Sequence, residues 1–174
     1  MEQTYSRTAN GQGTWMQMDD GTQLFVRRWQ PASGSPRAVL NIVHGMAEHS
    51  QRYGRLAGRL NAEGIEVWAA DQRGHGETGT NKQNDAGKGG LLGHSADGDG
   101  FSRVTQDIDT INRAIMKKYP GLPIFLLGHS WGSFIAQNYI ENFEGRPSAY
   151  GEPPVILEGC MLSGTRGPDG LKIA

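Results

Sequence analysis

The sequence predicts an α/β protein in which a mostly parallel β-sheet carries helices on both faces. Short apolar segments alternate along the chain with longer segments of helical periodicity. Some of the apolar segments are almost unbroken, as expected for strands buried on both faces of a sheet. A Gly-His-Ser-Trp-Gly turn at residues 128–132 lies directly between an apolar segment and a helical one.

Length and composition limit the number of domains and the classes of protein to which this sequence can belong. The 174 residues predict one domain, and a formal net charge of −1 predicts no basic face for a nucleic acid. Cys160, the single cysteine, excludes an internal disulfide and predicts a buried, unreactive thiol. No apolar run is long enough to span a bilayer, and residues 1–13 lack the apolar core of a signal peptide. We therefore expect a cytoplasmic protein with a polar leader at 1–13 and its domain at 14–174.

The first predicted element is a β-hairpin. Residues 14–18 predict a short strand anchored by Trp15, and Asp-Asp-Gly at 19–21 signals a turn. Residues 23–29 predict the second strand, so the two should pair across that turn.

A strand, a helix and another strand follow. Residues 38–43 are apolar apart from Asn41, as in a strand buried on both faces. Residues 52–63 carry apolar side chains at helical spacing, and Gly64 is the expected C-terminal cap. Residues 65–70 predict the next buried strand.

The middle of the chain predicts a loop and a long helix. Residues 79–100 are rich in Gly, Asn and Asp, which is typical of a surface loop. Residues 102–118 predict a helix that ends at Tyr-Pro-Gly, residues 119–121. Its apolar face consists of Val104, Ile108, Ile111 and Ile115.

The last predicted elements surround the Gly-His-Ser-Trp-Gly turn. Residues 124–127 predict a buried strand, and a helix follows the turn to about residue 143. Residues 144–154 contain three prolines and predict a loop, and residues 155–162 predict a final strand.

Three loops follow strands and should meet at one edge of the sheet. They are residues 44–50, 71–78 and 128–132. In open α/β sheets this edge holds the functional crevice. Ser130 lies in a G-x-S-x-G sequence on a strand–turn–helix segment, where a strained turn presents the serine hydroxyl as a nucleophile.

Five segments also carry a family resemblance: H-G-M-A-E-H-S-Q-R-Y (44–53), D-Q-R-G-H-G (71–76), G-H-S-A-D-G-D-G-F (93–101), G-H-S-W-G-S (128–133) and L-S-G-T (162–165). The chain resembles the N-terminal part of an α/β-hydrolase, in the branch of monoacylglycerol lipases, bacterial lysophospholipases and serine-aminopeptidase-like hydrolases. The resemblance begins near residue 14. It implies an α/β-hydrolase fold that is incomplete at the C-terminus, without its lid and last strands.

The resemblance implies a role for each matched residue. Ser130 becomes the acyl-accepting nucleophile, and the backbone N–H groups of Met46 and Trp131 form the oxyanion hole. Trp131 stands where this branch most often has methionine, which implies a reshaped pocket floor. Loop-shaping roles fall to His44, Gly45, Glu48 and Arg73.

Other charged and histidine residues of these motifs are expected to be structural. Glu48 and Arg73 either pair and brace their two loops or remain separate solvated charges. His75 is expected to shape a turn. His129, inside the elbow, is expected to point away from the crevice.

The resemblance also exposes what this sequence does not contain. The triad of this fold runs Ser, then Asp or Glu, then His, yet every histidine precedes Ser130. Glu158 and Asp169 follow it too closely to be the acid. We therefore expect a fragment, or one half of a two-part enzyme whose C-terminal half is a separate segment or chain. Alone, the chain is expected to be inactive and poorly soluble, because the strand at 155–162 would be an exposed edge.

The leading hypothesis is a serine hydrolase of acyl esters whose small lipid substrate is a monoacylglycerol or lysophospholipid. The missing lid would supply any peripheral membrane contact. A peptidase or small-ester hydrolase of the same fold, and a non-catalytic binding protein, remain alternatives. We expect neither cofactor nor metal, because the G-x-G-x-x-G at 74–79 is followed by a polar loop, and Asp97 and Asp99 lack the rest of a calcium loop.

Overall fold

The computed structural model describes residues 11–166 of the chain. Most of the expected leader lies outside the described residues, and the first strand begins within its last residues, at Gln12. No helix in the described range is long and apolar enough to cross a membrane.

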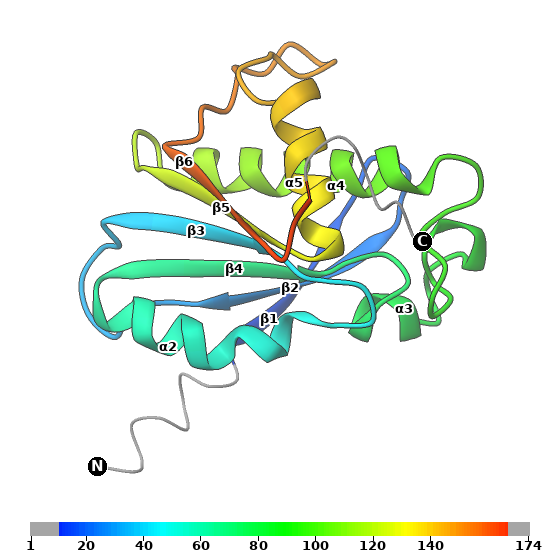
Figure 1. Ribbon diagram of the computed structural model, residues 1–174, viewed down its shortest axis with the longest axis horizontal. Coiled ribbons are helices and arrows are strands. Elements are labelled where there is room, and N and C mark those ends of the chain that lie inside the picture. Colours follow the sequence, from blue (N-terminus) through cyan, green and yellow to red (C-terminus); the bar gives the residue numbers. More distant parts are fainter. Residues whose placement is uncertain (1–10, 167–174) are drawn as a thin grey trace.

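A six-stranded sheet organises the molecule, with the strand order β1-β2-β4-β3-β5-β6 (Figure 1). The strands are β1 (Gln12–Gln17), β2 (Gln23–Trp29), β3 (Ala38–Val43), β4 (Ile65–Asp71), β5 (Ile124–His129) and β6 (Gly159–Ser163). The β1–β2 and β2–β4 pairs are antiparallel, and the other three pairs are parallel. The prediction of a mostly parallel sheet is confirmed.

Helices cover both faces of this sheet (Figure 1). They are α2 (Gly54–Ala62) on one face, and α4 (Gly100–Lys118) and α5 (Trp131–Asn142) on the other. Strand β3 contributes side chains to the hydrophobic core on each face of the sheet, because its successive side chains point to opposite faces. Leu40 and Ile42 pack in the α2 core, whereas Val39 and Val43 pack in the cores under α4 and α5.

Local sequence accounts for the long helix α4. The carboxylate of Asp99 accepts the backbone N–H of Ser102 at 3.0 Å and so caps the first turn. The four residues of the predicted apolar face are all buried: Val104, Ile108, Ile111 and Ile115.

Helix α2 is shorter than predicted, because Ser50–Tyr53 form a 3-10 turn ahead of it. Gly64 takes a left-handed φ of 76° just after α2, as the expected cap requires.

The final strand is shorter than predicted. Pairing with β5 begins only at Gly159, opposite Phe125. Just before it, the Glu158 N–H donates to the Ile124 carbonyl of β5 at 2.8 Å. Further back the backbone bonds elsewhere: the Val155 carbonyl accepts the N–H of Gly145 at 2.9 Å, and the Leu157 N–H reaches Glu144. The predicted strand at 155–162 is therefore wrong for its first residues, 155–157, where the backbone is held by the loop after α5.

Three smaller predictions also need correction. The loop predicted at 71–78 contains the start of a short helix, α3 (Gly76–Thr80), because the Asp71 carboxylate accepts the Glu77 N–H at 2.8 Å. Trp15 does not anchor the hairpin: it is 45% exposed and lies edge-on to Phe25, whereas Trp29 is buried. Cys160 is only half-buried, and that burial raises the pKa of its thiol.

Candidate active site

Ser130 occupies a strained turn between β5 and α5. Its backbone has φ 51° and ψ −117°, and within residues 11–166 only Ala47 is another non-glycine residue with positive φ. The Ser130 N–H donates to the Ser163 carbonyl at 2.8 Å, and the Ser133 hydroxyl donates to the Ser130 carbonyl at 2.6 Å. Ser130 is exposed, as its predicted role of nucleophile requires.

The glycines of the turn allow its close packing. A Cβ on Gly132 would overlap the Val43 carbonyl oxygen and lie 2.6 Å from the His44 carbonyl oxygen. A Cβ on Gly128 would meet the Gly132 carbonyl oxygen and lie 2.7 Å from the Ser133 Cα. Only glycine lets α5 begin this close to the end of β3.

The loop after β3 lies directly beside Ser130. A Cβ added to Gly45 would be 3.2 Å from the Ser130 Cβ. The Glu48 carboxylate holds this loop by accepting the Gly45 N–H at 3.1 Å and the Tyr53 hydroxyl at 2.9 Å. Burial alone would raise the pKa of Glu48, but these hydrogen bonds outweigh it and lower that pKa, so the carboxylate is ionised at neutral pH.

His44 is a fully buried, neutral residue that joins this loop to the next one. Its Nδ1–H donates to the Gly45 carbonyl at 2.8 Å, and its Nε2 accepts the Gln72 N–H at 3.0 Å. Burial lowers the pKa of His44 to about 4. Both ring nitrogens are therefore used within the scaffold, and His44 is not placed to act as a general base.

Asp71, the last residue of β4, also connects the loop after β3 to the loop after β4. Its carboxylate accepts the Ser50 N–H at 2.7 Å and the Glu77 N–H at 2.8 Å. Asp71 thus joins the loops predicted at 44–50 and 71–78, and Gly45 lies beside Ser130 of the turn at 128–132, so all three meet at one edge of the sheet. No local pattern indicated the part that Asp71 plays.

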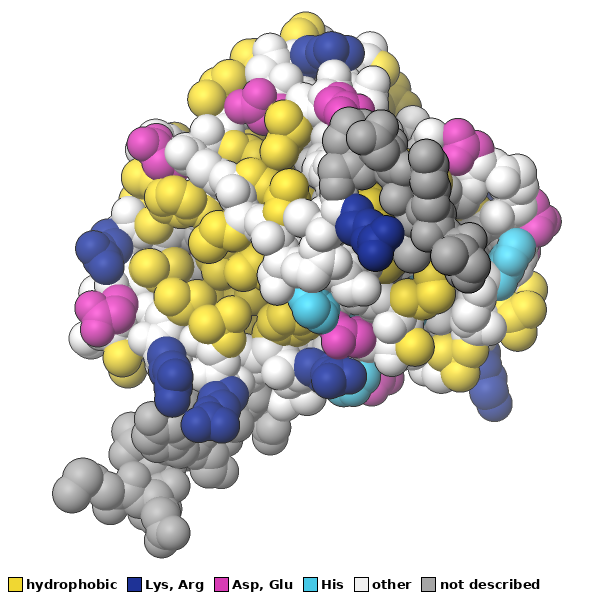
Figure 2. Space-filling model, viewed as in Figure 1, with side chains coloured by type: hydrophobic (Ala, Val, Ile, Leu, Met, Phe, Trp, Pro, Cys, Tyr) yellow, Lys and Arg dark blue, Asp and Glu magenta, His cyan; other side chains and the backbone are white. Residues whose placement is uncertain are grey.

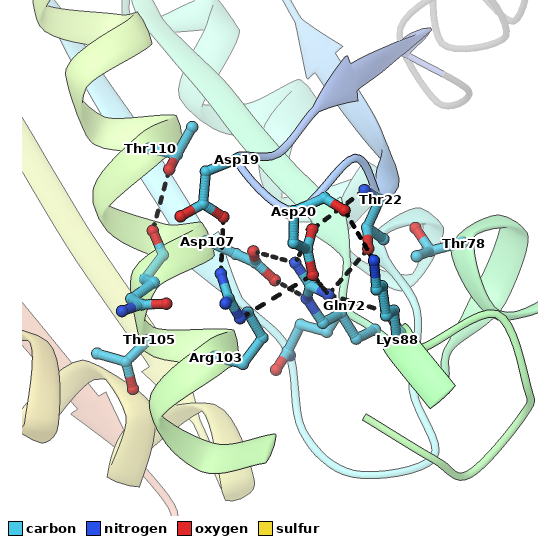
Figure 3. A network of polar contacts seen from close by, with 12 residues as sticks. Asp19, Asp20, Thr22, Gln72, Thr78, Lys88, Arg103, Thr105, Asp107 and Thr110 are labelled. Carbon is cyan, nitrogen blue, oxygen red and sulfur yellow. Dashed lines mark hydrogen bonds and ion pairs between the residues drawn. The ribbon is translucent and has the colours of Figure 1, made fainter. Parts of the chain in front are cut away.

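Arg73 does not pair with Glu48, contrary to one of the two predictions for this pair, and it is not solvated either. The guanidinium is fully buried, with Nε 2.7 Å from Asp107 Oδ2 and Nη1 2.7 Å from Asp20 Oδ2. Figure 3 shows Asp20, from the hairpin turn, and Asp107, from α4, converging on this network. Arg73 therefore fastens its loop to the hairpin and to α4, while Glu48 lies 3.5 Å from Arg52.

His129 is partly exposed and lies at the end of β5. Its Nδ1 is 3.2 Å from the Ser163 hydroxyl, and its Nε2 is 4.0 Å from Glu48 Oε1. Ser163 is opposite His129 in the β5–β6 register. The contact with Glu48 links the turn to the loop after β3, and sequence reasoning missed it because the two residues are far apart in the chain.

A cavity of about 520 Å³ opens at this edge of the sheet. The loops after β3 and β4 and the segment at 92–95 line it together with Trp131. Met46, whose side chain is 65% exposed, also contributes to the wall. Within residues 11–166, no three His, Cys, Asp or Glu side chains gather where they could hold a metal ion.

Comparison with known proteins gives consistent matches. Residues 34–165 match the family model described as serine aminopeptidase, S33. The chain is 40% identical over 155 residues to the monoglyceride lipase of Mus musculus, covering 88% of this chain and 45% of that protein. It is 34% identical over 154 residues to the monoacylglycerol lipase of Mycolicibacterium smegmatis, covering 88% of this chain and 48% of that protein.

The fold is shared with solved structures. A thermostable carboxyl esterase from Bacillus coagulans, solved with glycerol, matches with a TM-score of 0.70 and 31% identity, over 91% of this chain and 46% of the esterase. The chain therefore spans less than half the length of these three relatives.

Proposed function

Because this chain belongs to the serine aminopeptidase S33 family of α/β-hydrolases, we propose that it carries the nucleophile and oxyanion hole of an ester hydrolase. The relatives named as lipases and esterases support ester hydrolysis as the reaction class. The observation that carries the assignment to a residue is the backbone of Ser130, which holds an exposed hydroxyl on a turn of φ 51° at the end of β5. The proposed substrate is a monoacylglycerol or a lysophospholipid.

In the proposed reaction, Ser130 Oγ attacks the acyl carbonyl carbon. The backbone N–H groups of Met46 and Trp131 stabilise the negative charge that develops on the carbonyl oxygen. The alcohol then leaves with a proton, and the acyl group stays on Ser130 until water hydrolyses it. Glu48 supports this geometry because its bond to the Gly45 N–H fixes the loop that presents Met46.

The general base is proposed to come from outside this sequence. No histidine follows Ser130, and the buried imidazole of His44 has both nitrogens engaged. His129 bonds to Ser163. A polypeptide segment beyond these residues, in the same chain or a separate one, would supply the histidine and the acid, and without it only slow turnover is expected.

The outer edge of the sheet is a suitable place for that segment. Strand β6 ends the strand order, and its Met161 and Leu162 are 45% and 39% exposed. In the register with β5, Met161 lies opposite Leu127, which is only partly buried. Figure 2 shows hydrophobic side chains gathered over this region of the sheet, beside α2. Apolar strand edges of this kind recruit a further strand or aggregate.

A fluorophosphonate probe tests the nucleophile. Intact-mass analysis of this chain, alone and mixed with the downstream segment encoded in the same reading frame, should show one adduct on Ser130 in the mixture only. Ser130→Ala should abolish the adduct, and Ser163→Ala, which removes a nearby serine, should keep it. Absence of an adduct in every mixture would favour a non-catalytic binding protein instead.

A further inference from the structure

The side chain beside the nucleophile forms one wall of the cavity. Trp131 begins α5 directly after Ser130, and it lines the 520 Å³ cavity together with Met46 and Leu92. This volume lies in the range of small-molecule sites in proteins. The backbone N–H of Trp131 is a proposed oxyanion donor, so its indole has a fixed place relative to the acyl carbonyl carbon.

Two polar side chains in the cavity wall, Glu48 and His75, are already engaged in hydrogen bonds. Glu48 Oε2 accepts the Gly45 N–H and the Tyr53 hydroxyl. The Nδ1–H of His75 donates to the Arg73 carbonyl at 2.9 Å. A polyol headgroup needs free hydrogen-bonding partners when it leaves water, whereas an aliphatic chain needs only apolar contact. Met46, Leu92 and Trp131 supply that apolar contact, so the cavity suits the acyl chain better than the alcohol.

The indole of Trp131 is held in position by a second aromatic residue. The rings of Trp131 and Phe101 meet edge to face, with centroids 5.3 Å apart and planes inclined by 68°. Aromatic pairs in this arrangement are stabilised beyond their buried area. Phe101 belongs to α4, so the wall is anchored on two helices and should not move aside for a longer ligand.

We infer that Trp131 limits the length of the acyl chain that this cavity accepts, with Phe101 holding the indole in place. The inference rests on the proposed function, because it takes the acyl carbonyl to lie at Ser130. Removing the indole enlarges the cavity in the direction of α4, so longer chains become acceptable. Removing Phe101 lets the indole move and has the same effect to a smaller extent.

The test is isothermal titration of 1-monoacylglycerols, from butanoyl to dodecanoyl, into protein that carries Ser130→Ala and so cannot turn them over. Affinity should rise about fourfold with each methylene until the chain meets the wall, and then stay level. Trp131→Ala should move this limit to longer chains, and Phe101→Leu should move it less far. Phe143→Leu is the matched control, because Phe143 stacks on Tyr139 at the other end of α5 and does not line the cavity.

An unchanged limit in Trp131→Ala would overturn the inference, as would an equal shift in Phe143→Leu. Failure of every monoacylglycerol to bind would overturn it too. These outcomes are separate from a failure of the proposed function, because titration needs no catalysis and the adduct on Ser130 is measured independently.

Discussion

His44 accepts two hydrogen bonds from Gln72, one on its ring and one on its backbone carbonyl. The backbone N–H of Gln72 donates to His44 Nε2 at 3.0 Å, and the Gln72 side-chain amide donates to the His44 carbonyl at 2.7 Å. The pair connects the loop after β3, which carries Met46, to the loop after β4. The bond to the ring requires an unprotonated Nε2, so it exists only while His44 is neutral.

Protonation of His44 should therefore weaken the fold in acid. The pKa of His44 is lowered from its ordinary 6.5 to about 4 by burial, so the unfolded chain binds a proton in this window that the folded chain does not. Stability is complete above pH 6.5 and is lost as the pH falls toward 4, by up to roughly 3 kcal/mol. Urea unfolding at several pH values measures this loss.

His44→Asn identifies the residue responsible, because asparagine has no proton to gain in this range. The variant should be less stable at neutral pH, but its stability should change less between pH 6.5 and about 5. His94→Gln is the control, since His94 is exposed and pairs with Asp97 at 2.9 Å. An equal pH dependence in His44→Asn and in the unsubstituted protein would contradict the assignment.

Removing Arg73 should unfold the protein or come close to it. Arg73→Met leaves Asp107, a buried carboxylate, without the bidentate partner that now lies 2.7 and 2.9 Å away. Losing one member of such a pair costs about 3–5 kcal/mol. Chemical denaturation measures the free energy of unfolding.

Arg103→Ala is the matched control for that experiment. Arg103 pairs with Asp19 at 2.6 Å and reaches Asp20 only at 4.0 Å, and its side chain is 30% exposed, so it should contribute less than about 1 kcal/mol. Equal costs for the two arginines would show that the buried network contributes no more than a surface ion pair.

Local pattern predicted the parts of the fold that depend on neighbouring residues. Strand β3 was predicted at its observed bounds because a run that is apolar apart from Asn41 fits a strand buried on both sides. The apolar face of α4 and the turn around Ser130 likewise follow from spacing within a few residues. The ends of the predicted parallel strands also placed the loop after β3 near that turn.

Contacts between distant residues were beyond this kind of reasoning. Arg73 bonds to Asp20 and Asp107, which are 53 and 34 positions away, so no local spacing connects them. Strand β6 starts late for a related reason: whether Val155 bonds to β5 or to the loop at Gly145 depends on where α5 ends. The apolar character of 155–162 is the same in both cases.

Gly132→Ala should be strongly destabilising even though alanine is the better helix former. Gly132 lies in the first turn of α5, where helix propensity alone would favour alanine by about 1 kcal/mol. The added Cβ would overlap the Val43 carbonyl oxygen, however, and relieving that contact requires α5 to move away from β3. We expect a loss of more than about 2 kcal/mol and loss of the Ser130 adduct.

Gly159→Ala is the control for Gly132→Ala. A Cβ at Gly159 would lie 3.4 Å from the Phe125 ring, which is an ordinary contact. Its unfolding free energy should change by less than about 1 kcal/mol. A similar loss at both positions would mean that close approach at Gly132 is not the cause.

The strain at Ser130 predicts a reversal of the usual order of alanine and glycine. Ser130 has φ 51° and ψ −117°, a conformation that costs a residue with a Cβ about 1–3 kcal/mol and costs glycine little. Glycine also loses about 0.4–1 kcal/mol more conformational entropy on folding, which is the smaller effect. Ser130→Gly should therefore be more stable than Ser130→Ala in thermal or urea unfolding.

The same two substitutions at Ser133 separate the backbone strain at Ser130 from the loss of a serine hydroxyl. It lies three residues further on, inside α5, and both of its variants lose the hydroxyl that donates to the Ser130 carbonyl at 2.6 Å. The helix interior favours alanine over glycine by about 1 kcal/mol, so Ser133→Ala should be more stable than Ser133→Gly. If glycine is the more stable variant at Ser130 and alanine the more stable one at Ser133, the turn around Ser130 stores backbone strain. The same sign at both would mean that the turn is relaxed, and that Ser130 is presented to the crevice without strain.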